Sequence, residues 1–472
     1  MYHNLKVLVI CLLLSLPLAV TGQGTGDSPF SQFGIGDISA GGNVRNMGMG
    51  NAGISAGHHY FVNFANPALL PNKKTRRTPR ENHTYKYWDY YRNKTIDSTV
   101  KLDFAITYQN RSIQAANGYE KSSGMNISYL TFALPLTKTW ATALGIQPYS
   151  VVNYNLTYTS PVIGDSTISS VNSNSGRGGL YKVFWSHGVG LTENLSVGLE
   201  SAVVFGNVKT EDNSNIADFN VRYYGFQYQT AYNAISFKPG AHFRREIIKA
   251  YYDTIPVKDS LGNIARYDHI RKTKSTGVFY NIGFTCDLNS SMSIRRDLHL
   301  YIMDNANRIV MDTSLGVTKY RTTLPPTFKL GFSLDVPLKW TVAADVFYAD
   351  WSVYHSGFVA DALGKSYGIN VGGEFAPGQL KLKSRTYRLG FSYVKTPVIY
   401  RGYQLDDISI SIGGTIPFGR RSLTSPILPR INVALIGGQR GNVNQFGIRE
   451  QYFKVQFGIL INEKWFSKSK IY

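Results

Sequence analysis

Three glycines near the N-terminus have the spacing of a nucleotide-binding loop. Gly48, Gly50 and Gly53 form a Gly-x-Gly-x-x-Gly pattern, which in dinucleotide-binding proteins lets the backbone approach a pyrophosphate at a helix N-terminus. That chemistry also needs an apolar strand before the glycines and an acidic residue about 20 positions after them, and this sequence has neither. We therefore expect the glycines to form tight turns in a closely packed segment, with no cofactor.

Residues that could bind a metal or act as nucleophiles are scattered. His58 and His59 are adjacent, so in a strand their side chains would point to opposite faces and could not bind one ion together. The patterns His-Glu-x-x-His, Gly-x-Ser-x-Gly and Cys-x-x-Cys are absent. An enzyme acting on lipids would need a Ser/His/Asp or paired-carboxylate cluster, and no arrangement in the sequence nominates one. The sequence thus predicts neither a metal site nor an enzyme.

Four charged residues lie on the polar faces of segments whose opposite face is apolar: Lys329, Asp345, Arg388 and Lys454. If these segments surround a lumen, the charges project into it. There they could meet the carboxylate of an amphipathic ligand whose tail lies on Phe or Tyr. The alternative is that they pair with one another across a filled lumen.

The segments that position these residues are strands. In 327–335, Phe328, Leu330, Phe332 and Leu334 alternate with Lys, Gly, Ser and Asp, so one face is wholly apolar. A soluble sandwich would give the same alternation. The glycines and mixed charges on the polar faces, and short turns that alternate with long loops, favour a transmembrane barrel instead. The short turns are 136–140, 191–195 and 336–340, and the longer loops are 111–123, 158–177, 210–220, 354–365 and 439–449.

Fourteen candidate strands give an all-β fold, an antiparallel transmembrane β-barrel over residues 99–462. The strands are predicted at 100–110, 124–136, 139–157, 178–191, 194–209, 230–246, 275–290, 326–336, 340–353, 366–377, 384–395, 407–417, 429–438 and 450–461. Residues 245–275 form a long basic insertion that is periplasmic if the short turns face the periplasm. Residues 463–472 form a basic and aromatic tail.

The N-terminus predicts export. Residues 1–22 combine Lys6, a short apolar run and small residues at the end, which is typical of a cleaved signal peptide. Cys286 is then the single cysteine, so no internal disulfide is expected. The chain of 472 residues carries 50 Lys and Arg against 30 Asp and Glu. In an exported chain this excess favours anionic lipids and lipopolysaccharide over nucleic acid as partners.

Residues 23–98 lack strand alternation and are rich in small residues, which favours a hatch inside the barrel. This segment ends its glycine-rich part in Asn66, Pro67 and Ala68. Here the chain resembles the FadL/TodX family of outer-membrane transporters for hydrophobic compounds, whose hatch ends in the same tripeptide. Further similarity to the Bacteroidetes branch covers nearly the whole mature chain, including 145–149, 344–351, 387–391, 437–441 and 463–466. It departs at 245–275 and in the basic stretch 73–80.

The resemblance implies a monomeric fourteen-stranded barrel in the outer membrane of a Gram-negative bacterium. It implies passive uptake of fatty-acid-like or aromatic molecules, released sideways through a gap in the wall and gated by the hatch. Pro148 is the candidate for that gap, because it cannot donate to a strand ladder; a bulge or a position near the rim would also accommodate it. The alternative function is a non-transporting outer-membrane scaffold for periplasmic proteins of the type IX secretion machinery.

Overall fold

Alternating side chains determine the architecture. On the predicted strands the apolar residues face outward and the polar residues face inward: Phe328, Leu330 and Phe332 are exposed, whereas Ser333 and Asp335 are buried. A sheet with an apolar outer face and a polar inner face is stable in a membrane only when it closes on itself and leaves no edge. The sheet does so, because the last strand pairs with the first strand of the barrel, with Lys464 opposite Thr99.

The computed structural model describes residues 26–39, 41–58, 60–71, 99–115, 118–162, 165–216, 223–258, 264–303, 309–357, 363–377, 385–419 and 428–464. The predicted signal peptide, the basic stretch 73–80, His59 and most of the C-terminal tail lie outside these residues. No helix in the described ranges is long and apolar enough to cross a membrane.

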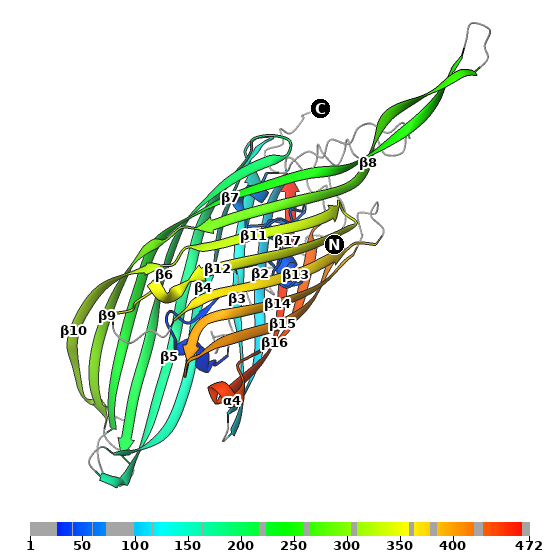
Figure 1. Ribbon diagram of the computed structural model, residues 1–472. Coiled ribbons are helices and arrows are strands. Elements are labelled where there is room, and N and C mark those ends of the chain that lie inside the picture. The colour runs from blue at the N-terminus through cyan, green and yellow to red at the C-terminus, as the bar shows by residue number, and fades with distance from the viewer. Residues whose placement is uncertain are drawn as a thin grey trace.

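Seventeen strands and several short helices are described (Figure 1). The strands are β1 (Asp37–Ile38), β2 (Thr99–Ala115), β3 (Gly118–Pro135), β4 (Trp140–Val162), β5 (Asp165–Gly190), β6 (Leu195–Ile216), β7 (Tyr223–Lys258), β8 (Ile264–Asp287), β9 (Ser290–Met303), β10 (Ile309–Leu324), β11 (Thr327–Val336), β12 (Trp340–Asp350), β13 (Lys365–Phe375), β14 (Thr386–Tyr400), β15 (Tyr403–Pro417), β16 (Arg430–Arg440) and β17 (Ile448–Lys464). The helices are η2 (Pro29–Gln32), α2 (Val44–Met47), η3 (Pro67–Leu69), η4 (Trp351–Val353) and α4 (Val443–Phe446).

Apart from β1, the described strands fill fourteen positions in the ring, because β8 and β9 share one position and β10 and β11 share another. β8 pairs with β11, and β9 pairs with β10. Pro325 and Pro326 separate β10 from β11, where prolines that cannot donate interrupt the ladder. β7 spans the break, since it pairs with β9 through residues 223–234 and with β8 through residues 240–258. The prediction of a closed antiparallel barrel of about fourteen strands is confirmed.

The sequence missed strands outside the alternating core. β9 and β10 were not predicted, and much of the predicted loops at 111–123, 158–177 and 210–220 belongs to β2 to β6. These extensions lie at the end of the barrel opposite the short turns. β9 does alternate, with Met292 and Ile294 buried. The extensions of β5 and β6 are polar on both faces, as in the Ser- and Asn-rich start of β5. Without an apolar face they carry no period-two signal, although their backbones continue the ladder.

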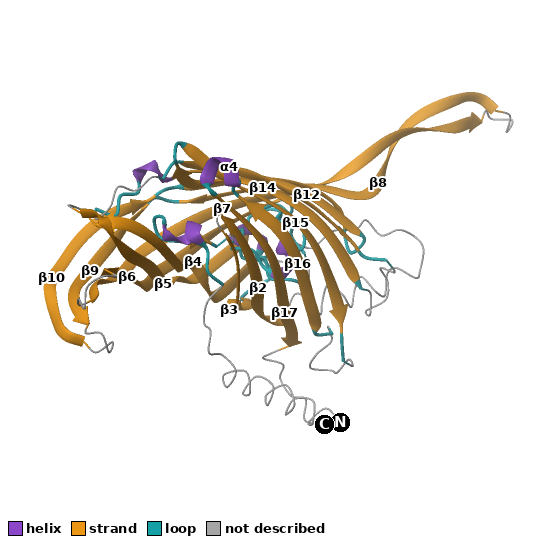
Figure 2. Cartoon of the chain, turned by 90° about the horizontal axis from the view of Figure 1, so that it is seen from below, coloured by secondary structure: helices purple, strands orange, loops and turns teal. Residues whose placement is uncertain are grey.

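The N-terminal segment, residues 26–71, lies inside the sheet (Figure 2). It contacts β4, β5, β6 and β7 on one side and β15, β16 and β17 on the other. The hairpin of β7 and β8 extends far beyond the ring. It leaves from the short-turn end, since Leu195 after the β5–β6 turn pairs with Phe243 and the hairpin starts after that residue.

Candidate functional site

A belt of glycines on the inner wall holds the middle of the N-terminal segment. Neighbouring strands place these glycines opposite one another: Gly188 with Gly198, Gly198 with Gly240, Gly283 with Gly331, and Gly372 with Gly390. A Cβ atom at each position would collide with residues of the segment or with side chains that touch it. The belt therefore lets the backbone of the segment lie directly against the barrel wall.

The predicted Gly48–Gly53 turns lie against this belt. Gly50 adopts a φ of 65°, in the left-handed region that favours glycine, and its N–H donates to Ser411 Oγ at 2.8 Å. The N–H groups of Gly53 and Ile54 both donate to Asp345 Oδ2, at 2.6 and 2.9 Å. Asp345 thus binds the turn of the segment.

Asn66, Pro67 and Ala68 dock next to this turn, against β6 and β7. The Asn66 side chain caps η3 by accepting from the Ala68 N–H at 3.0 Å, and its Nδ2 donates to the carbonyls of Ile54 and Ala241. Pro67 packs against the belt at Gly198. The tripeptide anchors the segment to β6 and β7.

Arg388 belongs to a buried ion cluster. Glu374 on β13 accepts from Arg45 Nε at 2.9 Å and from Arg388 Nε at 2.7 Å. Arg45 lies on α2 of the segment, and its Nη1 also donates to the Ala56 carbonyl at 2.9 Å. His58 Nε2 is 3.6 Å from Glu374 Oε1. The cluster links the segment to two strands of the wall.

The wall is interrupted beside Pro148. The ladder between β3 and β4 runs from Pro135 and Ala141 to Leu130 and Ile146 and ends there. Beyond that point β3 continues its pairing with β2 alone, and β4 pairs with β5. The β4–β5 register shifts between Pro148 and Ser150, as at a β-bulge that bends a strand.

The short strand β1 occupies the edge of β4 at this gap. Asp37 pairs with Val151 and Ile38 with Ser150. The Ser39 N–H donates to the Tyr149 carbonyl at 2.9 Å, and farther along β4 the Ser28 N–H donates to the Asn153 carbonyl at 2.8 Å. Residues 28–39 therefore satisfy backbone groups of β4 that β3 leaves unpaired.

Buried charges hold β1 in place. Asp37 Oδ2 lies 3.1 Å from Arg111 Nη2 on β2 and 3.0 Å from Arg440 Nη1 on β16. Arg111 also pairs with Glu450 at 2.6 Å. Burial by itself would raise the pKa of Asp37, but the guanidinium groups of Arg440 and Arg111 outweigh it and hold that pKa below its ordinary value. Asp37 is therefore a stable carboxylate that ties β1, paired with β4, to β2 and β16.

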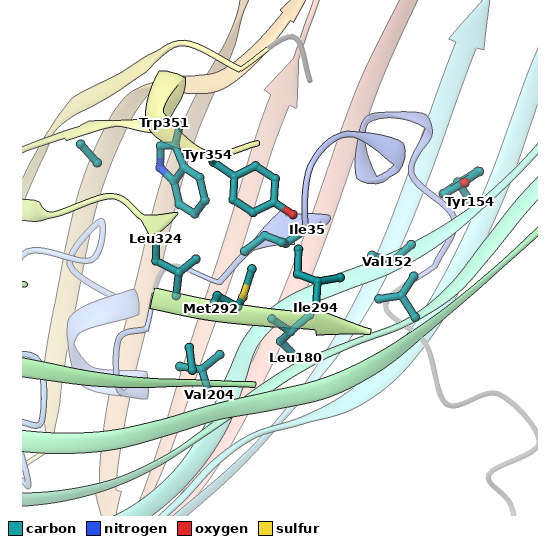
Figure 3. Packing of buried hydrophobic residues seen from close by; sticks show 13 residues of the cluster. Ile35, Val152, Tyr154, Leu180, Val204, Met292, Ile294, Leu324, Trp351 and Tyr354 are labelled. Carbon is teal, nitrogen blue, oxygen red and sulfur yellow. The ribbon is translucent and has the colours of Figure 1, made fainter. Parts of the chain in front are cut away.

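An apolar cluster adjoins the gap (Figure 3). Ile35, two residues before β1, packs among Val152 on β4 and residues of other strands, including Met292 and Ile294 on β9. Trp351 and Tyr354, after β12, cover the cluster from above in this view. The remaining members shown include Tyr154, Leu180, Val204 and Leu324. An apolar interior thus reaches the wall gap through the N-terminal segment.

The four predicted lumen charges do not form one site. Asp345 and Arg388 bind different parts of the N-terminal segment. Lys454 Nζ lies 4.5 Å from the centroid of the Tyr452 ring on β17. Lys329 is half-buried on β11, between Thr285 and Phe347 of the neighbouring strands. Within the described residues no group of three His, Cys, Asp or Glu side chains could hold a metal ion.

The sequence did not predict that Asp37, Arg45 or Glu374 would form buried ion pairs between the N-terminal segment and the wall. A usable signal exists for the first two, because Asp27, Asp37 and Arg45 are the only Asp, Glu, Lys or Arg residues in 23–57. A rare charge in a segment that is otherwise small and apolar needs a buried partner. The identity of that partner could not be read from the chain, because the partners lie far away in sequence.

Solved structures with the same fold include two from Pseudomonas. The Pseudomonas putida toluene transporter TodX matches with a TM-score of 0.52 and 13% identity, covering 91% of this chain and 100% of that chain. A Pseudomonas aeruginosa FadL homologue matches with a TM-score of 0.53 and 11% identity, covering 90% and 98%. The CymD monoaromatic hydrocarbon channel matches with a TM-score of 0.50 and 12% identity, covering 91% and 98%. At these identities the likeness shows the fold.

Among curated proteins, a search finds no match. The model of one protein family, BamG, matches residues 1–472. That match spans the N-terminal segment, the barrel and the projecting hairpin together. A closed barrel with an apolar outer face is an integral outer-membrane protein, and this chain belongs to the BamG family.

Proposed function

We propose that this protein is a passive outer-membrane channel for hydrophobic or amphipathic small molecules, aromatic or fatty-acid-like. The observation that carries the proposal is the wall gap at Pro148, which the apolar cluster reaches from inside and β1 closes. Solved barrels of this fold include a toluene transporter and a monoaromatic hydrocarbon channel. An apolar solute would leave the lumen sideways into the membrane and avoid the aqueous side of the barrel.

The proposed gate is residues 26–39, and the proposed anchor is the rest of the N-terminal segment. The anchor contains the glycine-belt contacts and the Asn66 cap, which involve many backbone groups. The gate is held by the β1 hydrogen bonds, by the hydrogen bonds of Ser28 to Glu450 and Asn153, by Asp37, and by the packing of Phe30 and Ile35. Opening therefore requires β1 to leave β4 while the anchor stays in place. We also propose that the barrel is a monomer in contact with anionic lipids and lipopolysaccharide.

A disulfide across β1 and β4 tests the proposal. Ile38→Cys with Ser150→Cys joins directly opposed residues, whose separation in an antiparallel pair suits a disulfide, in a Cys286→Ser background. Oxidation should abolish toluene uptake into proteoliposomes or cells, and reduction should restore it. A matched control, Thr415→Cys with Asn432→Cys, joins two strands that already pair elsewhere in the wall. Equal uptake by the oxidised and reduced gate variant would refute the gate.

A second candidate function rests on the β7–β8 hairpin. It projects from the short-turn end, which in outer-membrane barrels faces the periplasm, and residues 245–275 carry seven Lys and Arg against four Asp and Glu. Ile248, Tyr251 and Tyr252 are exposed on it. A two-stranded hairpin is marginally stable alone in water. This favours a docking role with periplasmic proteins such as those of the type IX secretion machinery.

A further inference from the structure

A pocket opens between the N-terminal segment and the turn that joins β11 to β12. It encloses about 450 Å³ of empty space, open solvent included. Its lining includes Tyr60 and Trp340, and the charged residues Lys339, Glu374 and Arg430. Because the β11–β12 turn is one of the short turns, the pocket lies at the proposed periplasmic end, away from the wall gap.

The pocket contains a buried guanidinium whose hydrogen bonds are incomplete. Arg430 is 5% exposed, and its Nε has no hydrogen-bond partner among the described residues. Its Cζ atom lies 4.0 Å from the centroid of the Tyr60 ring. This cation–π contact orients the guanidinium plane but leaves the Nε–H group for another acceptor.

Arg388, which pairs with Glu374, is also buried and also has N–H groups without an acceptor among the described residues. Its Nε donates to Glu374 Oε2, while its Nη1 and Nη2 have no partner among the described residues. The Glu374 carboxylate is already shared, because Arg45 donates to both of its oxygens at 2.9 and 3.2 Å. Glu374 therefore already has Arg45, Arg388 and His58 as partners, while Arg430 and exposed Lys339 line the same pocket.

We propose that this pocket is an oxyanion site that takes a carboxylate or a phosphate group. Buried guanidinium N–H groups are costly without acceptors, and the oxygens of a carboxylate or phosphate accept from them in pairs. Tyr60 and Trp340 supply an apolar wall for a chain attached to the anion. The site lies away from the proposed wall gap, and an uncharged hydrocarbon such as toluene has no use for it. The anion is either a free oxyanion of the periplasm or the headgroup of an acyl amphiphile.

Calorimetry of the purified full-length barrel in a non-ionic detergent tests the site with inorganic phosphate and with octanoate as probes. We expect saturable binding of one probe or both. Arg430→Gln should weaken it about tenfold or more, the loss expected for a charged hydrogen bond. Arg295→Gln, an exposed arginine on β9, should bind as the wild type does. Binding of phosphate assigns a free oxyanion, and binding of octanoate without phosphate assigns an amphiphile headgroup.

Lys339→Gln keeps the test decisive if Arg430→Gln does not fold. Lys339 is exposed in a turn, so the barrel should remain heat-modifiable on gels while anion affinity falls by roughly two- to threefold, as for an exposed charge pair. Absence of binding to both probes, or unchanged affinity in both pocket variants, would overturn the site. Toluene uptake is measured in parallel: it should be unchanged in Arg430→Gln, so that failure of the channel and failure of the anion site are told apart.

Discussion

Individual residues in this protein act mainly by letting two backbones meet or by fastening them. Gly390 permits contact: a Cβ there would collide with the backbone of Met49 and Gly50. Asp345 and Asn66 fasten the same segment through hydrogen bonds to its backbone. Asp37 fastens the gate through charge. These two kinds of residue fail differently when replaced, by steric collision or by loss of an attraction.

Gly390→Ala tests the belt. The added methyl group has no room beside Gly50, so we expect displacement of the N-terminal segment, with faster hydrogen exchange at residues 48–54 and greater sensitivity of the segment to protease. The barrel itself should remain heat-modifiable, since alanine is tolerated in a strand. Gly437→Ala on β16 is the matched control, because nothing lies within 4 Å of its added Cβ. Identical exchange in the two variants would contradict close packing against the belt.

Asp37→Asn tests the charge on the gate. Loss of the pairs with Arg111 and Arg440 should lower the free energy of local opening of residues 35–39 by on the order of 1–3 kcal/mol, measured by hydrogen exchange. In the wild type the folded pKa is depressed, so this stabilisation is present above the unfolded value of about 3.9 and is lost as pH falls through the folded pKa. The variant should lack that acid-dependent step. If hydrogen exchange in the wild type shows no such step, the ion pairs of Asp37 do not hold the gate closed.

At the scale of elements, β4 is the strand that makes a side exit feasible. Residues 141–146 of β4 are held on both sides, by β3 and β5. Beyond Ile146 the strand is held by β5 and, at its other edge, by β1 and the hydrogen bonds of Ser28 and Ser31 to Asn153. Most neighbouring strand pairs share longer uninterrupted ladders. The free energy needed to expose the edge of β4 is therefore the cost of removing residues 28–39 from it.

Pro148→Val tests the origin of the gap. Valine supplies the missing N–H and favours a regular strand, so the β3–β4 ladder should extend beyond Leu130 and Ile146. We expect an intact, heat-modifiable barrel whose toluene uptake falls severalfold. Pro161→Val, near the far end of β4 and also paired with β5, is the control and should not slow uptake. Uptake at the wild-type rate in a correctly inserted Pro148→Val barrel would show that Pro148 is not needed for the side exit.

The whole molecule has two different ends. The short turns and the β7–β8 hairpin lie at one end, and the long polar extensions of β4 to β7 with β9 and β10 lie at the other (Figure 1). The apolar outer band lies between them, so the ring crosses the membrane with the hairpin on one side only. A molecule built in this way can exchange solutes through its wall while it presents a separate surface for proteins.

Tyr251→Ser with Tyr252→Ser tests that separation. Both tyrosines are exposed on the hairpin, so folding and toluene uptake should be unchanged, while co-purification of secretion-machinery proteins should be lost. The control is Tyr119→Ser with Tyr158→Ser, two exposed tyrosines of the opposite end, and it should retain those proteins. If the hairpin variant retains them as well, the docking role is excluded for this surface.

The sequence by itself determined the barrel. Period-two alternation is a local property that any strand with one lipid face must show, so all fourteen ring positions were visible in it, as were the glycine-rich segment and its Asn66–Pro67–Ala68 end. The polar extensions of β5 and β6 have no apolar face and left no such pattern. Tertiary structure alone decided which groups meet: Asp37 with Arg111 and Arg440, Arg45 with Glu374, and β1 with β4. These partners are distant in the chain, and they come together only when the ring closes around the N-terminal segment.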